Sequence, residues 1–151
     1  MNLNNFKSFS KILFTIIFLF AGSNFLLAQV KICSWNLQNL GKSKSDFEIE
    51  IMAQTIKNFD VVAIQEVVAG YGGPQAVARL VDELNRTGAK WNYQISEATE
   101  STPYATERYA FLWKTSNVQS VGRASLIKTM LRRSIGSLSL EALGTTGKNL
   151  L

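Results

Sequence analysis

Residues 61–67 read VVAIQEV, and this stretch decides how the chain folds. Its first residues, Val61–Ile64, form a short and continuous apolar run, which is typical of a strand buried on both faces of a sheet. The run ends in a polar pair, Gln65 and Glu66. A buried strand has no packing use for a carboxylate at its end, so the sequence raises the question of what Glu66 does.

Helical and strand patterns alternate on both sides of this stretch. The pattern of residues 30–36 predicts a strand that ends at Asn36. Ser45 and Glu48 have the spacing of a capping box, and an apolar periodicity of three and four residues follows them. A second helix is predicted after a glycine-rich loop, from Pro74 to a stop at Gly88. Further strands are predicted at 91–96, 109–114 and 118–123, the last two pairing across a short turn.

The first 28 residues have the layout of a secretory signal peptide. Lys7 and Lys11 precede an apolar run, and the small residue Ala28 closes the segment, so cleavage is expected near residues 28–29. A membrane anchor is the alternative, but the run is interrupted at 22–24 and is short for the ~20 apolar residues of a spanning helix. We therefore expect an exported protein, extracellular or periplasmic, without a stable membrane span after cleavage.

Charge and cysteine content limit the remaining function classes. The net charge of +5 comes from the C-terminal part, because residues 29–113 carry eight Lys/Arg and ten Asp/Glu, whereas residues 114–151 carry six and one. The basic balance is therefore weak evidence for a nucleic-acid surface on the folded part. The single cysteine, Cys33, excludes an intramolecular disulfide and is expected to be a small core residue.

Polar residues at strand ends are the first candidates for chemistry. Glu66 follows an apolar strand, where ligands of open sheets commonly bind, and its carboxylate suits Mg²⁺ or Ca²⁺. Asn36 also ends a predicted strand, and its amide can hold a phosphate oxygen or a metal-bound water. The alternatives are an idle solvated acid and an amide that bonds its own backbone. If both strands are neighbours, Asn36 and Glu66 project from the same edge.

A third candidate is the segment before the strand at 109–114. Glu107 could orient a general base, Arg108 could hold a phosphate through two hydrogen bonds, and Tyr104 or Tyr109 could stack on a base or sugar. A surface Glu–Arg pair beside a core tyrosine is the alternative.

Together these stretches resemble a known family. SWNLQNLG at 34–41, VVAIQEV at 61–67 and ERYAFLWK at 107–114 resemble the N-terminal half of the DNase I-like endonuclease/exonuclease/phosphatase superfamily, over about residues 29–123. The last stretch is similar to secreted deoxyribonucleases. The resemblance implies an α+β fold, a DNase I-like two-sheet β-sandwich flanked by helices, of which only about the first half is present.

The resemblance also implies a function. Members hydrolyse phosphodiesters or phosphomonoesters with Mg²⁺ and often Ca²⁺. It assigns metal binding to Glu66, the phosphate–metal site to Asn36, support of a catalytic histidine to Glu107 and a DNA contact near Tyr104. A secreted deoxyribonuclease that acts on DNA is therefore expected. The alternatives are a sphingomyelinase-like or phosphatase-like hydrolase and a non-catalytic remnant or binding module.

The sequence departs from that family in its chemistry and in its last part. It contains no histidine, and residues 124–151 form an atypical basic tail in which no aromatic residue occurs. Altered chemistry in a complete protein is one interpretation. The other, which we favour, is a product truncated by a frameshift or early stop, whose tail from about residue 124 is not family sequence. A short helix is predicted at about 125–134, and we expect little or no activity and poor solubility.

Overall fold

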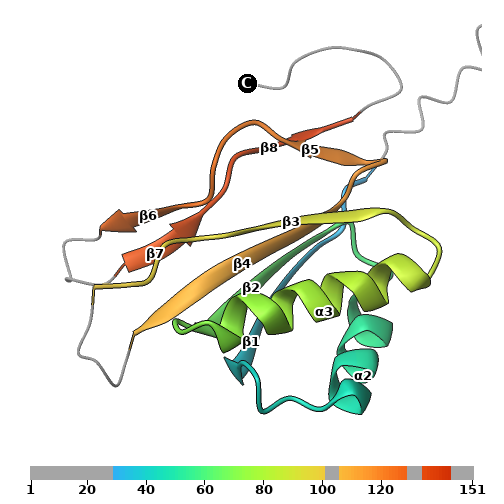
Figure 1. The fold of residues 1–151 in the computed structure, drawn as a ribbon. Coiled ribbons are helices and arrows are strands. Elements are labelled where there is room, and N and C mark those ends of the chain that lie inside the picture. Colours follow the sequence, from blue (N-terminus) through green and yellow to red (C-terminus); the bar gives the residue numbers. More distant parts are fainter. Residues whose placement is uncertain (1–28, 101–105, 129–133, 144–151) are drawn as a thin grey trace, which may run out of the picture.

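The computed structural model describes residues 29–100, 106–128 and 134–143 (Figure 1). The predicted signal peptide and Tyr104 lie outside these ranges. In the described part of the chain, no helix is both long and apolar enough to cross a membrane.

A four-stranded mixed sheet organises the fold, with the strand order β1-β2-β4-β3. Strands β1 and β2 are parallel, and β4 runs antiparallel to both β2 and β3. A parallel pair needs a crossover connection, and helix α2 supplies it. The strands are β1 (Ile32–Leu40), β2 (Val61–Val68), β3 (Trp91–Ile95) and β4 (Glu107–Lys114). The mixed sheet and its helices confirm the predicted α+β class.

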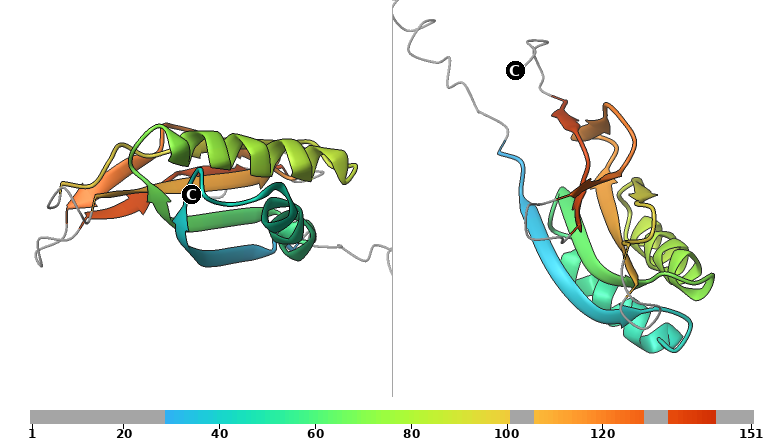
Figure 2. Two further views of the ribbon diagram at one scale, coloured as in Figure 1. Left: turned by 60° about the horizontal axis from the view of Figure 1, so that its bottom comes forward. Right: turned by 90° about the vertical axis from the view of Figure 1, so that its left-hand side faces the viewer.

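Helices α2 (Asp46–Ile56) and α3 (Gly72–Arg86) pack on one face of this sheet (Figure 2). Helix α2 begins at the predicted capping box, in which Ser45 accepts from the Glu48 N–H and the Glu48 carboxylate accepts from the Ser45 N–H. Helix α3 ends at the predicted place, because Gly88 takes a φ of 102° that few other residues adopt. Between helices and sheet lies one apolar core, which includes Ile56, Ile64, Leu80, Leu84 and Leu112.

The opposite face of the sheet carries four short strands, β5 (Val118–Ser120), β6 (Ser125–Lys128), β7 (Ser134–Ser137) and β8 (Leu140–Ala142). Two predictions were wrong here. The strand at 118–123 pairs with β8 rather than with β4, and residues 125–128 and 134–137 form the β6–β7 pair instead of a helix. Local sequence did not reveal these pairings, because each depends on a partner that lies later in the chain.

Aromatic residues of β4 explain why these strands gather there. Trp113 and Val118 form a small buried cluster against which Leu138 and Leu140 pack. Nearer the start of β4, the Tyr109 ring lies directly against the backbone of Gly136. The cover does not reach the outer strand β1, where Ile32 stays 69% exposed.

A buried carboxylate joins several elements at the end of the sheet where β1 and β2 begin. Asp60 accepts the Lys31 N–H at 2.8 Å and Nδ2 of Asn117 at 2.7 Å, and its Oδ1 lies 3.7 Å from Nζ of Lys114. Burial by itself would raise the pKa of Asp60, but these hydrogen bonds and the Lys114 charge together lower it below its ordinary value. The side chain is only 10% exposed, so it acts as an internal tie.

Candidate functional site

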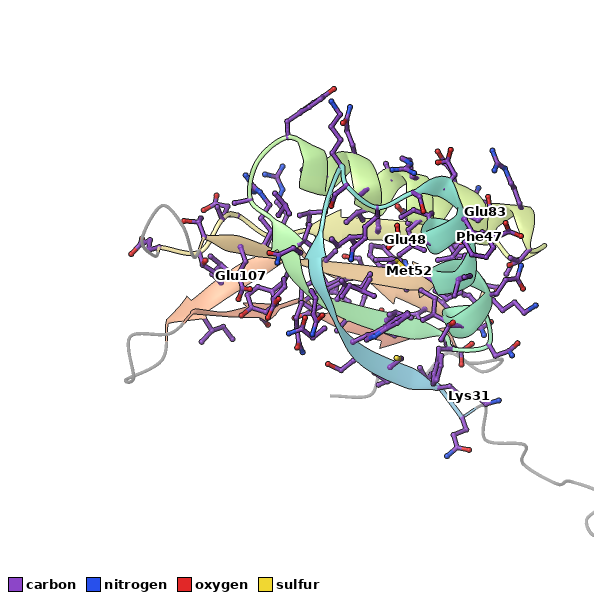
Figure 3. All side chains as sticks on the ribbon, turned by 90° about the horizontal axis from the view of Figure 1, so that it is seen from below. Lys31, Phe47, Glu48, Met52, Glu83 and Glu107 are labelled. Carbon is purple, nitrogen blue, oxygen red and sulfur yellow. The ribbon has the colours of Figure 1, made fainter. Side chains whose placement is uncertain are left out.

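The candidate site lies at the other end of the sheet, where β1 and β2 finish and β4 starts. In the register of the sheet, Asn36 pairs with Gln65, and Val68 pairs with Glu107. The parts of the strands that carry Asn36, Glu66 and Glu107 therefore meet at one end of the sheet, as the sequence predicts for Asn36 and Glu66. Figure 3 shows Glu107 at the end of the sheet opposite Lys31.

Asn36 and Glu66 are in direct contact. Nδ2 of Asn36 donates a hydrogen bond of 2.7 Å to Oε1 of Glu66. Earlier along the same two strands, Nε2 of Gln65 donates to Oγ of Ser34 at 2.9 Å. Ser34 and Asn36 are two residues apart and so point to the same face of β1. Their partners Gln65 and Glu66 therefore share that face, although they are consecutive in sequence.

A bulge in β2 explains this exception to strand alternation. Ile64 pairs with Ala110 and Val67 with Arg108, so two residues of β2 stand opposite the single residue Tyr109. Regular alternation would aim Glu66 at the helix face, together with Ile64. Instead, Glu66 takes a left-handed φ of 56°, which costs an L-residue roughly 1–2 kcal/mol. Such strain persists only where the surrounding structure enforces it, and it concentrates at functional sites.

The end of β1 is irregular at the same level. Asn36 pairs with Gln65 and Leu40 with Val67, so the residues between them leave the regular ladder. Gln38 and Asn39 both have positive φ, 44° and 62°. The Gln38 N–H donates to Oδ1 of Asn36 at 2.9 Å. This bond fixes the amide orientation, because the oxygen is used on one side and the NH₂ group is left facing Glu66.

These side chains offer few but suitable ligands for a cation. Asn36 is exposed and Glu66 is half-buried, so both are accessible from solvent. Among the residues that the structure describes, no three or more His, Cys, Asp or Glu side chains gather to hold a metal ion. Mg²⁺ is commonly held by only one or two carboxylates, with water and substrate phosphates completing its shell. The Glu66 carboxylate fits that mode.

Glu107 and Tyr109 contact each other, whereas Arg108 contacts the backbone that follows β2 and β3. Oη of Tyr109 donates to Oε1 of Glu107 at 3.3 Å, and burial together with the Glu107 charge raises the pKa of Tyr109. Arg108 donates from Nε to the Ala69 carbonyl and from Nη1 to the Ser96 carbonyl, each at 2.9 Å. Substrate contacts by Arg108 and Tyr104, and the catalytic role of Glu107, stay predictions.

Sequence reasoning missed the residues that shape the site, namely Gln38, Asn39 and Gln65. A signal existed for Asn39, because asparagine is enriched at left-handed positions where glycine is absent. The side-chain contacts of Gln65 and Gln38 depend on register and could not be read from the sequence.

No protein-family model matches the chain. Curated proteins with similar sequences are deoxyribonucleases. One from Thioalkalivibrio sp. (strain K90mix) is 38% identical over 99 residues, which cover 65% of this chain and 26% of that protein. These matches agree with the resemblance to the DNase I-like endonuclease/exonuclease/phosphatase superfamily that the sequence motifs indicate.

Two further similarities are more distant. Human deoxyribonuclease gamma is 30% identical over 90 residues, which cover 56% of this chain and 28% of that protein. An endonuclease/exonuclease/phosphatase family protein from Leptotrichia buccalis C-1013-b has a solved structure that aligns with a TM-score of 0.48 at 20% identity, covering 73% of this chain and 49% of that one. The chain thus spans about a quarter of the length of the Thioalkalivibrio deoxyribonuclease and of human deoxyribonuclease gamma.

Proposed function

We propose that Asn36, Glu66 and Glu107 belong to the site of a divalent-metal-dependent phosphodiesterase that acts on DNA. The observation that carries the proposal is the 2.7 Å contact between Asn36 and Glu66, made by two irregular strand ends at one sheet edge. The strained backbone of Glu66 has no packing purpose, because its side chain is directed away from the core. The deoxyribonuclease names of the curated relatives support the reaction and the DNA substrate.

Glu66 would hold the cation, which we propose to be Mg²⁺, with Ca²⁺ as a second candidate. Asn36 orients the carboxylate through Nδ2, and its second amide hydrogen remains to be offered to a phosphate oxygen. A bound divalent cation supplies positive charge to the phosphoryl oxygens of a phosphodiester.

Proton transfer is the weak part of this site. Residues 1–151 contain no histidine. They therefore supply no imidazole to act as the general base that Glu107 was predicted to orient. In the structure the Glu107 carboxylate instead accepts from the Tyr109 hydroxyl. We therefore expect cation and phosphodiester binding with slow cleavage by this chain.

A plasmid-nicking assay with Mg²⁺, Ca²⁺ or both tests the proposal. Glu66→Ala and Glu66→Gln remove the ligand, and Glu50→Gln, an exposed acid on α2, is the matched control. Nicking by the wild type and the control, but not by the Glu66 variants, is expected. Nicking that survives Glu66→Ala would rule out the metal assignment. Sphingomyelin vesicles and a phosphomonoester, assayed in parallel, test the two other hydrolase substrates.

Binding without cleavage is a second candidate function, favoured by the lack of histidine. Fluorescence anisotropy of a labelled DNA duplex, measured with and without Mg²⁺, separates the two. Mg²⁺-dependent binding without nicking would favour the binding module. We also propose export through residues 1–28, which fusion of that segment to a secretion reporter tests.

A further inference from the structure

Arg108 occupies a particular place relative to the β2 bulge. It pairs with Val67, the first residue after Glu66, so it lies where the regular ladder between β2 and β4 resumes. Alternation along β4 puts Arg108 on the same face as Ala110 and Leu112, which are buried under the helices. Glu66 contacts Asn36 from the other face. Arg108 therefore stands behind the candidate site.

The guanidinium of Arg108 joins two chain segments across β4. Nε donates to the carbonyl of Ala69, which follows β2, and Nη1 donates to the carbonyl of Ser96, which follows β3. Both distances are 2.9 Å, and the side chain is half-buried. Two donors in a rigid planar fork can satisfy two separate carbonyls at once, which a lysine ammonium on its flexible stem does poorly.

Ala69 is three residues after Glu66, so the first of these bonds limits how the end of β2 can move. If that end were released, Glu66 could leave its left-handed conformation and its contact with Asn36, because a left-handed residue other than glycine persists only when its surroundings enforce it. The second bond anchors the guanidinium to β3. These two hydrogen bonds of Arg108, here called the Arg108 clamp, thus hold the bulged backbone that aims Glu66 at Asn36.

We propose that Arg108 is a positioning residue of the candidate site, which fixes the bulged end of β2 through the Ala69 and Ser96 carbonyls. The part of this proposal that concerns a bound cation rests on the proposed function. The part that concerns the Asn36–Glu66 contact does not.

The test compares Arg108→Lys with Arg79→Lys in the full chain. Arg79 is the matched control because its guanidinium also bonds a carbonyl, that of Lys44, and pairs with Asp46, away from the bulge. The first readout is the NMR signal of the Asn36 side-chain amide, which reports the contact with Glu66. The second is Mg²⁺ affinity by calorimetry. Arg108→Lys should shift the Asn36 signal and weaken Mg²⁺ binding about tenfold or more, and Arg79→Lys should change neither.

Each outcome bears on the proposal. A folded Arg108→Lys protein with an unchanged Asn36 signal would overturn it. If the wild type binds no Mg²⁺, the proposed function fails, while the Asn36 signal still tests the clamp. If Arg108→Lys does not fold, a thymidine dinucleotide is titrated into the wild type. A shift of the Asn36 amide with an unchanged Arg108 Nε–H signal supports positioning, and a shift of the Nε–H signal overturns it by making Arg108 a direct ligand.

Discussion

Replacing Asp60 by asparagine should destabilise the fold strongly while changing its shape little. The wild-type carboxylate accepts from the Lys31 N–H and from Nδ2 of Asn117, and it lies 3.7 Å from the Lys114 ammonium. An asparagine at this position would keep one acceptor oxygen but would turn an NH₂ group toward the second donor. One donor would then lose its partner in a place that water hardly reaches.

The size of the effect follows from these contacts. A hydrogen bond to a charged group contributes about 1.5–3 kcal/mol, and a neutral one about 1 kcal/mol. Losing one charged bond and weakening the other therefore costs about 3 kcal/mol in the free energy of unfolding, or about 10 °C in Tm. The matched control is Asp82→Asn, which removes an exposed carboxylate on α3 and should change stability by less than about 0.5 kcal/mol.

Urea unfolding followed by tryptophan fluorescence at several pH values measures this difference. The pKa of Asp60 is lower in the folded state than in the unfolded chain, so its charge stabilises the fold above the unfolded pKa of about 3.9. The difference in the free energy of unfolding between wild type and Asp60→Asn should be constant from about pH 5.5 to 8. It should shrink at lower pH, as acid protonates Asp60 in the folded state. A gap below about 1 kcal/mol at pH 7, or one that grows in acid, would refute this reasoning.

Three further changes test other features. Gly136→Ala would drive a Cβ into the ring of Tyr109, so it should push β7 away and cost about 1–3 kcal/mol in urea unfolding, with a change in tyrosine fluorescence. Ser45→Ala removes the α2 cap and should lower stability by about 1 kcal/mol, with less helical circular dichroism near the midpoint. Glu66→Asn should keep stability within about 0.5 kcal/mol, because asparagine tolerates a left-handed φ, yet abolish Mg²⁺ binding in calorimetry.

The parts of the fold that the sequence predicted are those that depend on neighbouring residues. Ser45 and Glu48 form their capping box within one helical turn, and Gly88 ends α3 by its own conformational freedom. The apolar run at Val61 forms a central strand, as expected. By contrast, β5 pairs with β8, twenty or more residues away, and Leu126 is compatible with either a strand or a helix.

The proximity of Asn36 and Glu66 was predictable from the sequence, but the geometry of their contact was not. Both strands continue beyond their predicted ends, since Asn36 lies four residues before the end of β1 and Glu66 two residues before the end of β2. The parallel pairing of these strands still brings the two residues together. The bulge in β2, the irregular end of β1, the positive φ of Glu66 and the contact of Gln65 with Ser34 arise only when three strands are aligned. Arg108 shows the same limit, because its two carbonyl partners belong to segments whose proximity no local pattern encodes.

The bulge in β2 also separates the fate of the site from the fate of the core. The strand holds one residue more than its partner requires, and the surplus lies entirely on the face away from the helices. A deletion of Glu66 would leave Gln65 alone between Ile64 and Val67, restore regular alternation and keep Ile64 and Val67 on the core side. Single-residue insertions and deletions at this point can therefore add or erase the chemistry without rebuilding the protein. In evolutionary terms, the scaffold could outlast the proposed function.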